Sequence, residues 1–128
     1  MASQLKSREE VQSVATELRS LSPGVVGGVV RMRQYGYEEG KVARKYKLLT
    51  AMAISVAIRC EPCIRAYVEW AAKEGASKEE LVEFLNVAIT MQGCPGEEWA
   101  IRALKAYHEL VESNSVGADE GCCEVPKT

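Results

Sequence analysis

The chain has 128 residues, of which 47% are hydrophobic and 27% are charged, values that are typical of one globular domain with a core of its own. The net charge is −2 and no block of basic residues occurs, so a nucleic-acid partner is not expected. The most apolar run, residues 48–58, is too short to span a bilayer, and the first residues lack the apolar segment of a signal peptide. We therefore expect a cytoplasmic protein without membrane contact.

The first third of the chain is predicted to form two helices. Residues 3–21 place apolar side chains near one face, and Ser7 with Glu10 has the spacing of a capping box just inside this helix. Residues 25–38 are ambiguous, because their β-branched valines favour a strand while their spacing fits a helix. No second strand candidate exists for pairing, so a helix is predicted there.

Residues 42–58 give the strongest helical pattern of the chain. Its second part, residues 48–58, is apolar almost all round, which is typical of a helix that is buried on most faces. We therefore expect this helix to be central in the fold or to lie in a subunit interface.

The rest of the chain predicts three more helices and a tail. Proline is tolerated in the first turn of a helix, and Ser77 with Glu80 forms a second capping box. The predicted bounds are 62–74, 77–92 and 97–112, with a break at 93–96. The composition after residue 112 predicts a disordered tail. The expected architecture is all-α with about six helices: a single domain over residues 1–112 and a flexible, cysteine-containing tail over 113–128.

Five cysteines are distributed unevenly along the chain. In a reducing compartment they are not expected to form a disulfide framework, and an odd number cannot pair completely. They occur as a C-x-x-C pair, a single thiol before a proline and an adjacent pair in the tail: Cys60 and Cys63, Cys94, and Cys122 and Cys123.

The C-x-x-C pair at a predicted helix start is typical of redox chemistry. Thiolates are the reactive form, and the amide groups of a helix N-terminus favour negative charge. Arg59 and Arg65 favour it too, whereas Glu61 opposes it. One thiol can attack a peroxide or a disulfide and the other can resolve the product.

Two other interpretations of the pair remain open. A C-x-x-C can be half of a zinc site, but His108, Cys94 and the tail thiols do not have the paired spacing of further ligands. Both cysteines can also be small core residues. We expect neither a metal ion nor a bound cofactor at the pair, and we expect His108 to be a surface or packing residue.

Several segments resemble a known family when they are taken together. They are residues 45–53 (KYKLLTAMA), 60–63 (CEPC), 71–81 (AAKEGASKEEL), 87–93 (VAITMQG) and Pro95. Their order and spacing resemble the carboxymuconolactone decarboxylase / AhpD-like alkylhydroperoxidase family over residues 25–111. The resemblance implies an AhpD-like helical bundle that assembles as trimers or hexamers. It also implies a thiol peroxidase or disulfide reductase that receives electrons from a dithiol donor, such as a lipoylated or thioredoxin-like protein.

The resemblance implies Cys63 as the peroxide-reacting thiol and Cys60 as its disulfide partner, but the family's proton relay is missing. Leu48 stands where AhpD-type members have a glutamate, and Tyr67 where they have a histidine four residues after the second cysteine. Pro62 replaces a second histidine of some members. Tyrosine is a poor base at neutral pH, although it can donate a hydrogen bond from one turn beyond Cys63.

Tyr67 is therefore either a site residue or an ordinary core aromatic. The candidates for a replacement base are Glu38, Glu39, Glu61 and Glu69.

The expected function is a thiol-based oxidoreductase that reduces a peroxide or a disulfide with the Cys60–Cys63 pair. Cys94, Cys122 and Cys123 are possible accessory thiols. The alternative is a non-peroxidatic family member that binds a metal or metalloid through the tail thiols, or that has a structural role. Decarboxylase members lack the redox pair, so lactone decarboxylation is the less expected activity.

Overall fold

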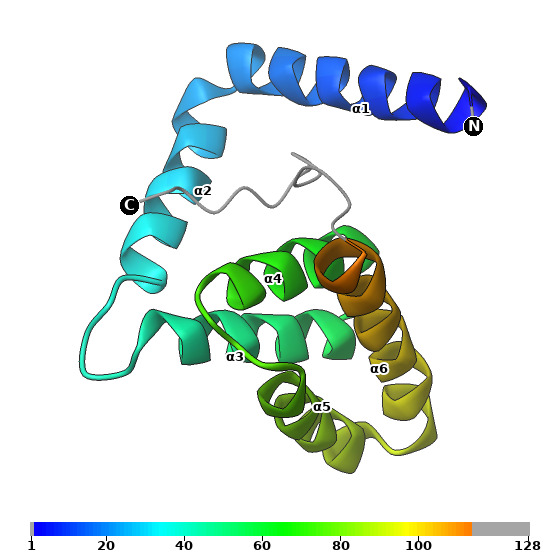
Figure 1. The fold of residues 1–128 in the computed structure, drawn as a ribbon. Coiled ribbons are helices and arrows are strands. Elements are labelled where there is room, and N and C mark those ends of the chain that lie inside the picture. Colours follow the sequence, from blue (N-terminus) through cyan, green and yellow to red (C-terminus); the bar gives the residue numbers. More distant parts are fainter. Residues whose placement is uncertain (1, 114–128) are drawn as a thin grey trace. The chain divides into compact units, whose positions relative to one another are not determined.

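The structure is a computed structural model that describes residues 2–113, and helices fill most of that range without any strand (Figure 1). The predicted all-α architecture of about six helices is therefore confirmed. The chain divides into two compact units, one that reaches Glu38 and one that starts at Glu39, and each is described by itself. The predicted single domain over residues 1–112 stays a prediction. Apart from Ser113, the predicted tail lies outside the described residues.

The first unit contains α1 (Ala2–Leu21) and α2 (Pro23–Gly36). Helix α1 begins at Ala2, so Ser7 and Glu10 both lie inside it and neither is its N-cap residue. Pro23 is the first residue of α2, where the missing amide hydrogen has no helical partner to lose. The helix predicted over residues 25–38 is confirmed for residues 25–36, and Tyr37 and Glu38 lie beyond the end of α2.

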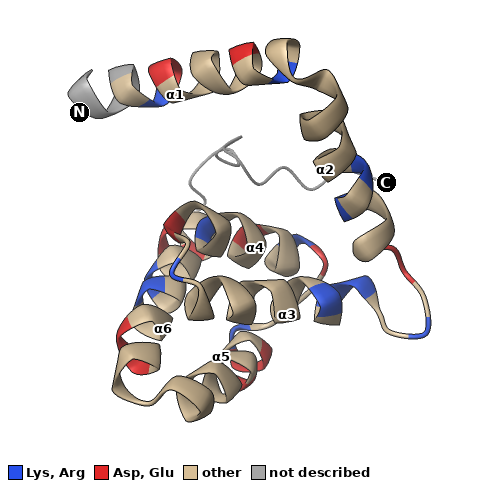
Figure 2. Ribbon diagram, turned by 180° about the vertical axis from the view of Figure 1, so that it is seen from behind, with Lys and Arg blue, Asp and Glu red and all other residues tan. Residues whose placement is uncertain are grey.

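The second unit contains α3 (Arg44–Ala57), α4 (Glu61–Lys73), α5 (Lys78–Gln92), α6 (Cys94–Tyr107) and the π-helix η1 (His108–Glu112). Helices α3 and α4 lie side by side, and α6 crosses the end at which they are connected (Figure 1). Helix α5 packs on both α3 and α6. The basic residues of α3 gather at its start, and the rest of this helix carries no charge (Figure 2).

Helix α3 supplies much of the core of the second unit. The largest fully buried side chains are Leu48, Leu49, Met52, Val56, Ile64, Val68 and Leu81. The opposite face of α3 is open, with Ile54 and Ile58 exposed by 54% and 66%. Helix α3 is central, because it contacts α4, α5 and α6. Its apolar surface is nevertheless larger than the surface that one chain buries.

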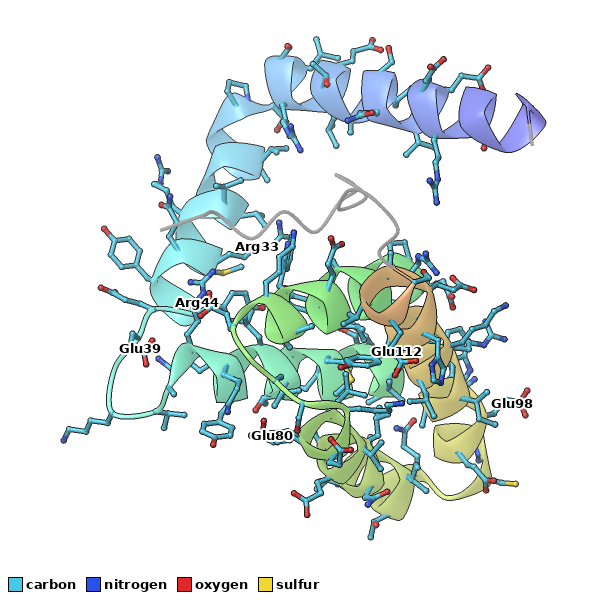
Figure 3. The ribbon with its side chains drawn as sticks, in the orientation of Figure 1. Arg33, Glu39, Arg44, Glu80, Glu98 and Glu112 are labelled. Carbon is cyan, nitrogen blue, oxygen red and sulfur yellow. A yellow bond between two sulfur atoms is a disulfide. The ribbon has the colours of Figure 1, made fainter. Side chains whose placement is uncertain are left out.

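The capping box predicted at the start of α5 is present. The backbone N–H of Glu80 donates to the Ser77 hydroxyl, and the Ser77 N–H donates to the Glu80 carboxylate, both at 3.1 Å. Lys45 of α3 adds an ion pair with Glu80 at 3.0 Å, which ties the starts of α3 and α5 together (Figure 3). The hydrogen bond from the Ser77 backbone, followed by the one from Lys45, lowers the pKa of Glu80 below its ordinary value.

Acid is expected to weaken this connection between α3 and α5. Because the folded-state pKa of Glu80 lies below the unfolded value, its carboxylate stabilises the fold above the unfolded pKa, and this stabilisation is lost as the pH falls through the folded one. Glu80→Gln should therefore give a shallower loss of urea stability between about pH 5 and pH 3 than the unchanged protein shows. An identical pH slope in the two proteins would contradict the pairing.

Helix α6 begins at Cys94, three residues earlier than predicted. Gly93 alone separates it from α5, since its φ of 71° and ψ of −141° suit glycine and turn the chain sharply within one residue. Pro95 then occupies the first turn of α6, where proline is tolerated. The predicted break at 93–96 is therefore wrong for three of its four residues.

Gly96 allows α5 and α6 to approach closely. A methyl group on this residue would lie 2.9 Å from Cβ of Gln92, 3.0 Å from the Ala88 carbonyl oxygen and 3.1 Å from Cα of Ile89. Two of these three neighbours are backbone atoms, which cannot move aside without shifting the helix. The α5–α6 packing therefore requires glycine at this position.

Gly96→Ala is expected to lower the free energy of unfolding by about 1–3 kcal/mol through overpacking, measured as a shift of the urea midpoint. Gly28→Ala is the matched control, because Gly28 is also helical but has nothing within 4 Å of the added methyl group. This control should be neutral or stabilising by about 0.5–1 kcal/mol. Equal effects of the two changes would contradict the close approach.

Candidate thiol site

The connection between α3 and α4 places the two cysteines. Helix α3 ends in a Schellman motif: the Cys60 N–H donates to the Ser55 carbonyl at 3.1 Å, and the Arg59 N–H donates to the Val56 carbonyl at 3.3 Å. The residue between the two helices in such a motif adopts a left-handed conformation and is usually glycine. Here it is Arg59, with φ at 58°, and within residues 2–113 no other non-glycine residue has a positive φ.

Cys60 and Cys63 are joined by a disulfide at the N-terminus of α4. Cys60 is the N-cap residue and Cys63 lies in the first turn, with their Cα atoms 5.2 Å apart. Both residues are half-buried, so reactants from solvent can reach this end of the helix. The expectation that the pair can form a local disulfide is met by this geometry.

Glu61 stands between the two cysteines, and its charge is compensated by α6. The Arg102 guanidinium lies 3.4 Å from the Glu61 carboxylate, and its Cζ atom lies 3.9 Å from the centroid of the Trp99 ring. Stacking on an indole holds a guanidinium in place and leaves its edge free to pair with a carboxylate. The unfavourable effect of Glu61 on a nearby thiolate is therefore smaller than the sequence predicts.

The other arginines that flank the pair differ in their pairing. Arg65 donates to the Glu109 carboxylate at 2.8 Å, and this hydrogen bond, with the added charge of Lys105, lowers the pKa of Glu109. Arg59 is exposed and forms no ion pair with any residue that the structure describes. Of the three arginine charges around the disulfide, those of Arg65 and Arg102 are balanced and that of Arg59 is not.

The two positions at which the resemblance to AhpD-type members implies a proton relay are buried here. Leu48 is fully buried in the core. The Tyr67 side chain is 6% exposed and packs edge-to-face against Trp70, with the ring centroids 5.5 Å apart. Tyr67 is therefore a core aromatic residue. It also lies one turn beyond Cys63 on the same helix, which places it near the disulfide.

Ser55 is a buried polar residue of this site that the sequence did not single out. It is 2% exposed, and its hydroxyl donates to the Ala51 carbonyl at 2.7 Å. Its own carbonyl accepts the Cys60 N–H. The Ser55 carbonyl thus fixes the backbone position of Cys60. In the sequence, Ser55 could have been noticed because it is a polar residue within an apolar helical run.

The proposed replacement bases are spread over the chain. Glu61 lies at the site, whereas Glu69 is two turns further along α4, buried, and paired with Lys73 at 3.3 Å. Glu39 precedes α3 in the long connection (Figure 3), and Glu38 belongs to the other unit. Glu61 is therefore the candidate that the chain holds next to the thiols.

The accessory thiols are not brought to the disulfide in the described part of the chain. Cys94 is exposed and is the first residue of α6. Arg102, which reaches Glu61, is two turns further on, a rise of about 12 Å along the helix. The idea that the loop of Cys94 folds over the pair is therefore not supported. Cys122 and Cys123 lie outside the described residues.

His108 lies on the surface at the start of η1 and pairs with Glu112, which also pairs with Lys78 of α5. The hydrogen bond from Lys78, followed by that from His108, lowers the pKa of Glu112. Within residues 2–113, no group of three or more histidine, cysteine or acidic side chains has a geometry that could hold a metal ion. None of the described helices is both long and apolar enough to cross a membrane.

Arg102 and Glu109 were also missed by the sequence analysis. Each lies more than forty residues from its partner, Glu61 or Arg65. In the sequence, a charged residue that forms a distant ion pair does not differ from one that faces solvent. No local pattern therefore predicts such a pair. Only the packing of α6 and η1 on α4 brings them to the thiols.

The chain is similar to several known proteins. An uncharacterised protein of Cupriavidus necator is 27% identical over 111 residues, covering 86% of this chain and 98% of that protein. The uncharacterised protein 4 in the cox locus of Paracoccus denitrificans is 30% identical over 74 residues, covering 58% of this chain and 67% of that protein.

A crystal structure from Legionella pneumophila, the apo form of a carboxymuconolactone decarboxylase family protein, matches with a TM-score of 0.75 and 32% identity. The match covers 79% of this chain and 90% of the Legionella chain. The sequence profile of the carboxymuconolactone decarboxylase family matches residues 23–106. This range holds all of α2 to α5 and nearly all of α6. The chain therefore belongs to the carboxymuconolactone decarboxylase family.

Proposed function

We propose that this protein is a thiol-based oxidoreductase of the AhpD-like type, in which Cys60 and Cys63 cycle between a dithiol and a disulfide. The observation that carries the proposal is the disulfide at the half-exposed N-terminus of α4. The helix end favours a thiolate, and the charge of Arg59, which pairs with no described carboxylate, acts in the same direction. A purely structural disulfide would gain nothing from such surroundings.

The proposed cycle uses both thiols. In the reduced protein the Cys63 thiolate attacks a disulfide R–S–S–R, which forms a mixed disulfide and releases one thiolate. Cys60 then loses its proton and attacks the Cys63 sulfur, which closes the Cys60–Cys63 disulfide and releases the second thiolate. With a peroxide, Cys63 becomes a sulfenic acid and an alcohol leaves, and attack by Cys60 then releases water. An external dithiol restores both thiols, and a lipoylated or thioredoxin-like protein of the cytoplasm is the donor we propose.

Disulfides are the more suitable substrates for this site. An alkoxide leaving group is far more basic than a thiolate and needs a proton as the O–O bond breaks. The histidine and glutamate that provide it in AhpD-type members are replaced here by the buried Tyr67 and Leu48. We therefore propose disulfide exchange as the faster reaction and peroxide reduction as the slower one.

A turnover assay tests this proposal directly. The fully reduced protein is supplied with excess dithiol donor and with either a small disulfide or an alkyl hydroperoxide, and consumption is followed beyond one equivalent. Multiple turnovers with the disulfide support the proposal. If neither substrate is consumed beyond the stoichiometric amount, the protein is not an oxidoreductase of this kind.

The competing proposal is a module that binds a soft metal ion or an arsenical through Cys122 and Cys123, two adjacent thiols in a polar segment. Metal analysis of the purified protein with and without residues 113–128 separates the two. Metal that is retained only by the full chain, together with no turnover, would favour the module.

We also propose that the protein forms a homo-oligomer, a trimer or hexamer as is usual in the family. Apolar side chains on α3 and α5 support this proposal. Tyr46 of α3 and Phe84 of α5 stack with their ring centroids 6.3 Å apart. On the same two helices Ile54, Val87 and Met91 are exposed by 54%, 61% and 84%. Exposed apolar side chains of this size on two helices that pack against each other are typical of a subunit interface.

Ile54→Glu is expected to convert the oligomer to a monomer without unfolding it, because the Ile54 side chain is more than half exposed in the single chain. Sedimentation velocity measures the change, and circular dichroism checks the helix content. Glu98→Gln, at a side chain that points away from the bundle (Figure 3), should leave the oligomer intact. A monomeric unchanged protein would contradict the proposal.

A further inference from the structure

The residue that precedes the disulfide combines three unusual properties. Arg59 is exposed, forms no ion pair with a described residue, and adopts a left-handed backbone conformation with φ at 58°. Glycine is the usual residue at this position of a helix end because any side chain there is disfavoured. The chain instead carries a long cation at the backbone position directly before the first cysteine.

The two carboxylates that pair with the other arginines near the thiol pair do not need Arg59. Glu61 is paired with Arg102 at 3.4 Å, and Glu109 with Arg65 at 2.8 Å. Each of these two carboxylates therefore already has a cationic partner. Since no described carboxylate pairs with Arg59, its charge is available to a group that comes from outside.

From this arrangement we propose that Arg59 is a specificity-determining residue that pairs with a carboxylate of the disulfide substrate. The preferred substrate class is a disulfide with a carboxylate close to its sulfur atoms. This inference rests on the proposed oxidoreductase function. A guanidinium suits this role because its planar donors match a carboxylate. The same charge also favours the thiolate of the reduced pair, so the test must separate substrate recognition from thiol activation.

Two aromatic disulfide probes make that separation. The dianionic probe is 5,5′-dithiobis(2-nitrobenzoate) and the neutral probe is 2,2′-dithiodipyridine; both release a coloured thiol. Each reacts with the reduced pair as described above: two electrons pass to the probe, the Cys60–Cys63 disulfide forms and two thiolates leave. A change in thiolate reactivity alters the rates of both probes, whereas loss of carboxylate pairing alters only that of the anionic one.

The proteins compared carry serine at Cys94, Cys122 and Cys123, so that only the pair reacts. Arg59→Gln keeps a non-glycine residue at the same φ, and Arg59→Lys keeps the charge. Lys41→Gln is the matched control for net charge. It removes one exposed cation before the start of α3, and α3 has 14 residues, which places the change about 20 Å along the helix from Arg59.

The ratio of the anionic to the neutral probe rate is expected to fall about three- to fivefold in Arg59→Gln, the effect of a partly exposed charge pair. Arg59→Lys should recover part of the ratio, and Lys41→Gln should leave it unchanged. The effect should shrink with rising ionic strength. An unchanged ratio in Arg59→Gln would overturn the inference, whether the rates of both probes stay the same or change by the same factor. The oxidoreductase function would not be affected by that result. No reaction of the pair with either probe would overturn the proposed function itself.

Discussion

Cys63→Ser is expected to abolish turnover of both disulfides and peroxides, with a loss of about a thousandfold or more. The hydroxyl of serine is not ionised at neutral pH and cannot form a disulfide, so both the attacking group and the product of the cycle disappear. The fold should persist, because Cys63 lies in the half-exposed first turn of α4 and serine is nearly the same size. Steady-state rates and the urea midpoint measure the two effects.

Cys60→Ser gives the informative contrast. The attack by Cys63 is retained but resolution is lost, so one equivalent of thiolate is released and a mixed disulfide at Cys63 accumulates. Cys94→Ser should behave like the unchanged protein, since Cys94 lies at the far end of α6 from the pair. Full turnover by Cys63→Ser would contradict the assignment of roles. So would a mixed disulfide that accumulates on Cys60 in Cys63→Ser while none forms on Cys63 in Cys60→Ser.

Tyr67→His is expected to raise peroxide turnover by about tenfold to a hundredfold while leaving disulfide exchange nearly unchanged. A histidine one turn beyond Cys63 can accept the thiol proton and return it to the leaving alkoxide, which is the contribution that general acid–base catalysis makes. Disulfide exchange has a better leaving group and depends less on this proton. The rates with the two substrates are measured side by side.

The same change should also lower the free energy of unfolding by about 1–3 kcal/mol, because Tyr67 is buried and packs against Trp70. Tyr67→Phe is the matched control, since it keeps the ring and removes only the hydroxyl. If Tyr67→His leaves peroxide turnover unchanged and remains folded, the missing histidine is not what limits the reaction. A restored glutamate at Leu48 is a less direct test, because that position is fully buried and an unpaired charge there would destabilise the fold.

The helices were predictable because their signals are local. The capping box of Ser77 and Glu80 marks the start of α5 in sequence and is found there. The start of α6 was placed three residues too late, since Gly93-Cys94-Pro95-Gly96 reads as a turn, although only Gly93 leaves helical geometry. Proline and glycine in a first helical turn are compatible with the helix, and sequence alone does not separate that case from a loop.

The thiol pair was predictable from its spacing, but its electrostatic surroundings were not. The spacing of Cys60 and Cys63 and the helix start between them are visible in sequence. The pairing of Glu61 with Arg102 depends on how α6 crosses α4, and the left-handed conformation of Arg59 depends on where α3 ends. Both features are consequences of tertiary packing. The sequence indicated a mixture of positive and negative charge around the thiols. In the structure, Glu61 is paired with Arg102 and the charge of Arg59 has no described partner.

Whether Cys60 and Cys63 form a working redox pair can be measured by mass spectrometry of the fully reduced protein after treatment with an alkyl hydroperoxide or a small disulfide. The expected result is a loss of two hydrogens from the single peptide that contains both Cys60 and Cys63, and its reversal by a dithiol. If both thiols remain free after treatment while the protein is folded, they are not a working redox pair.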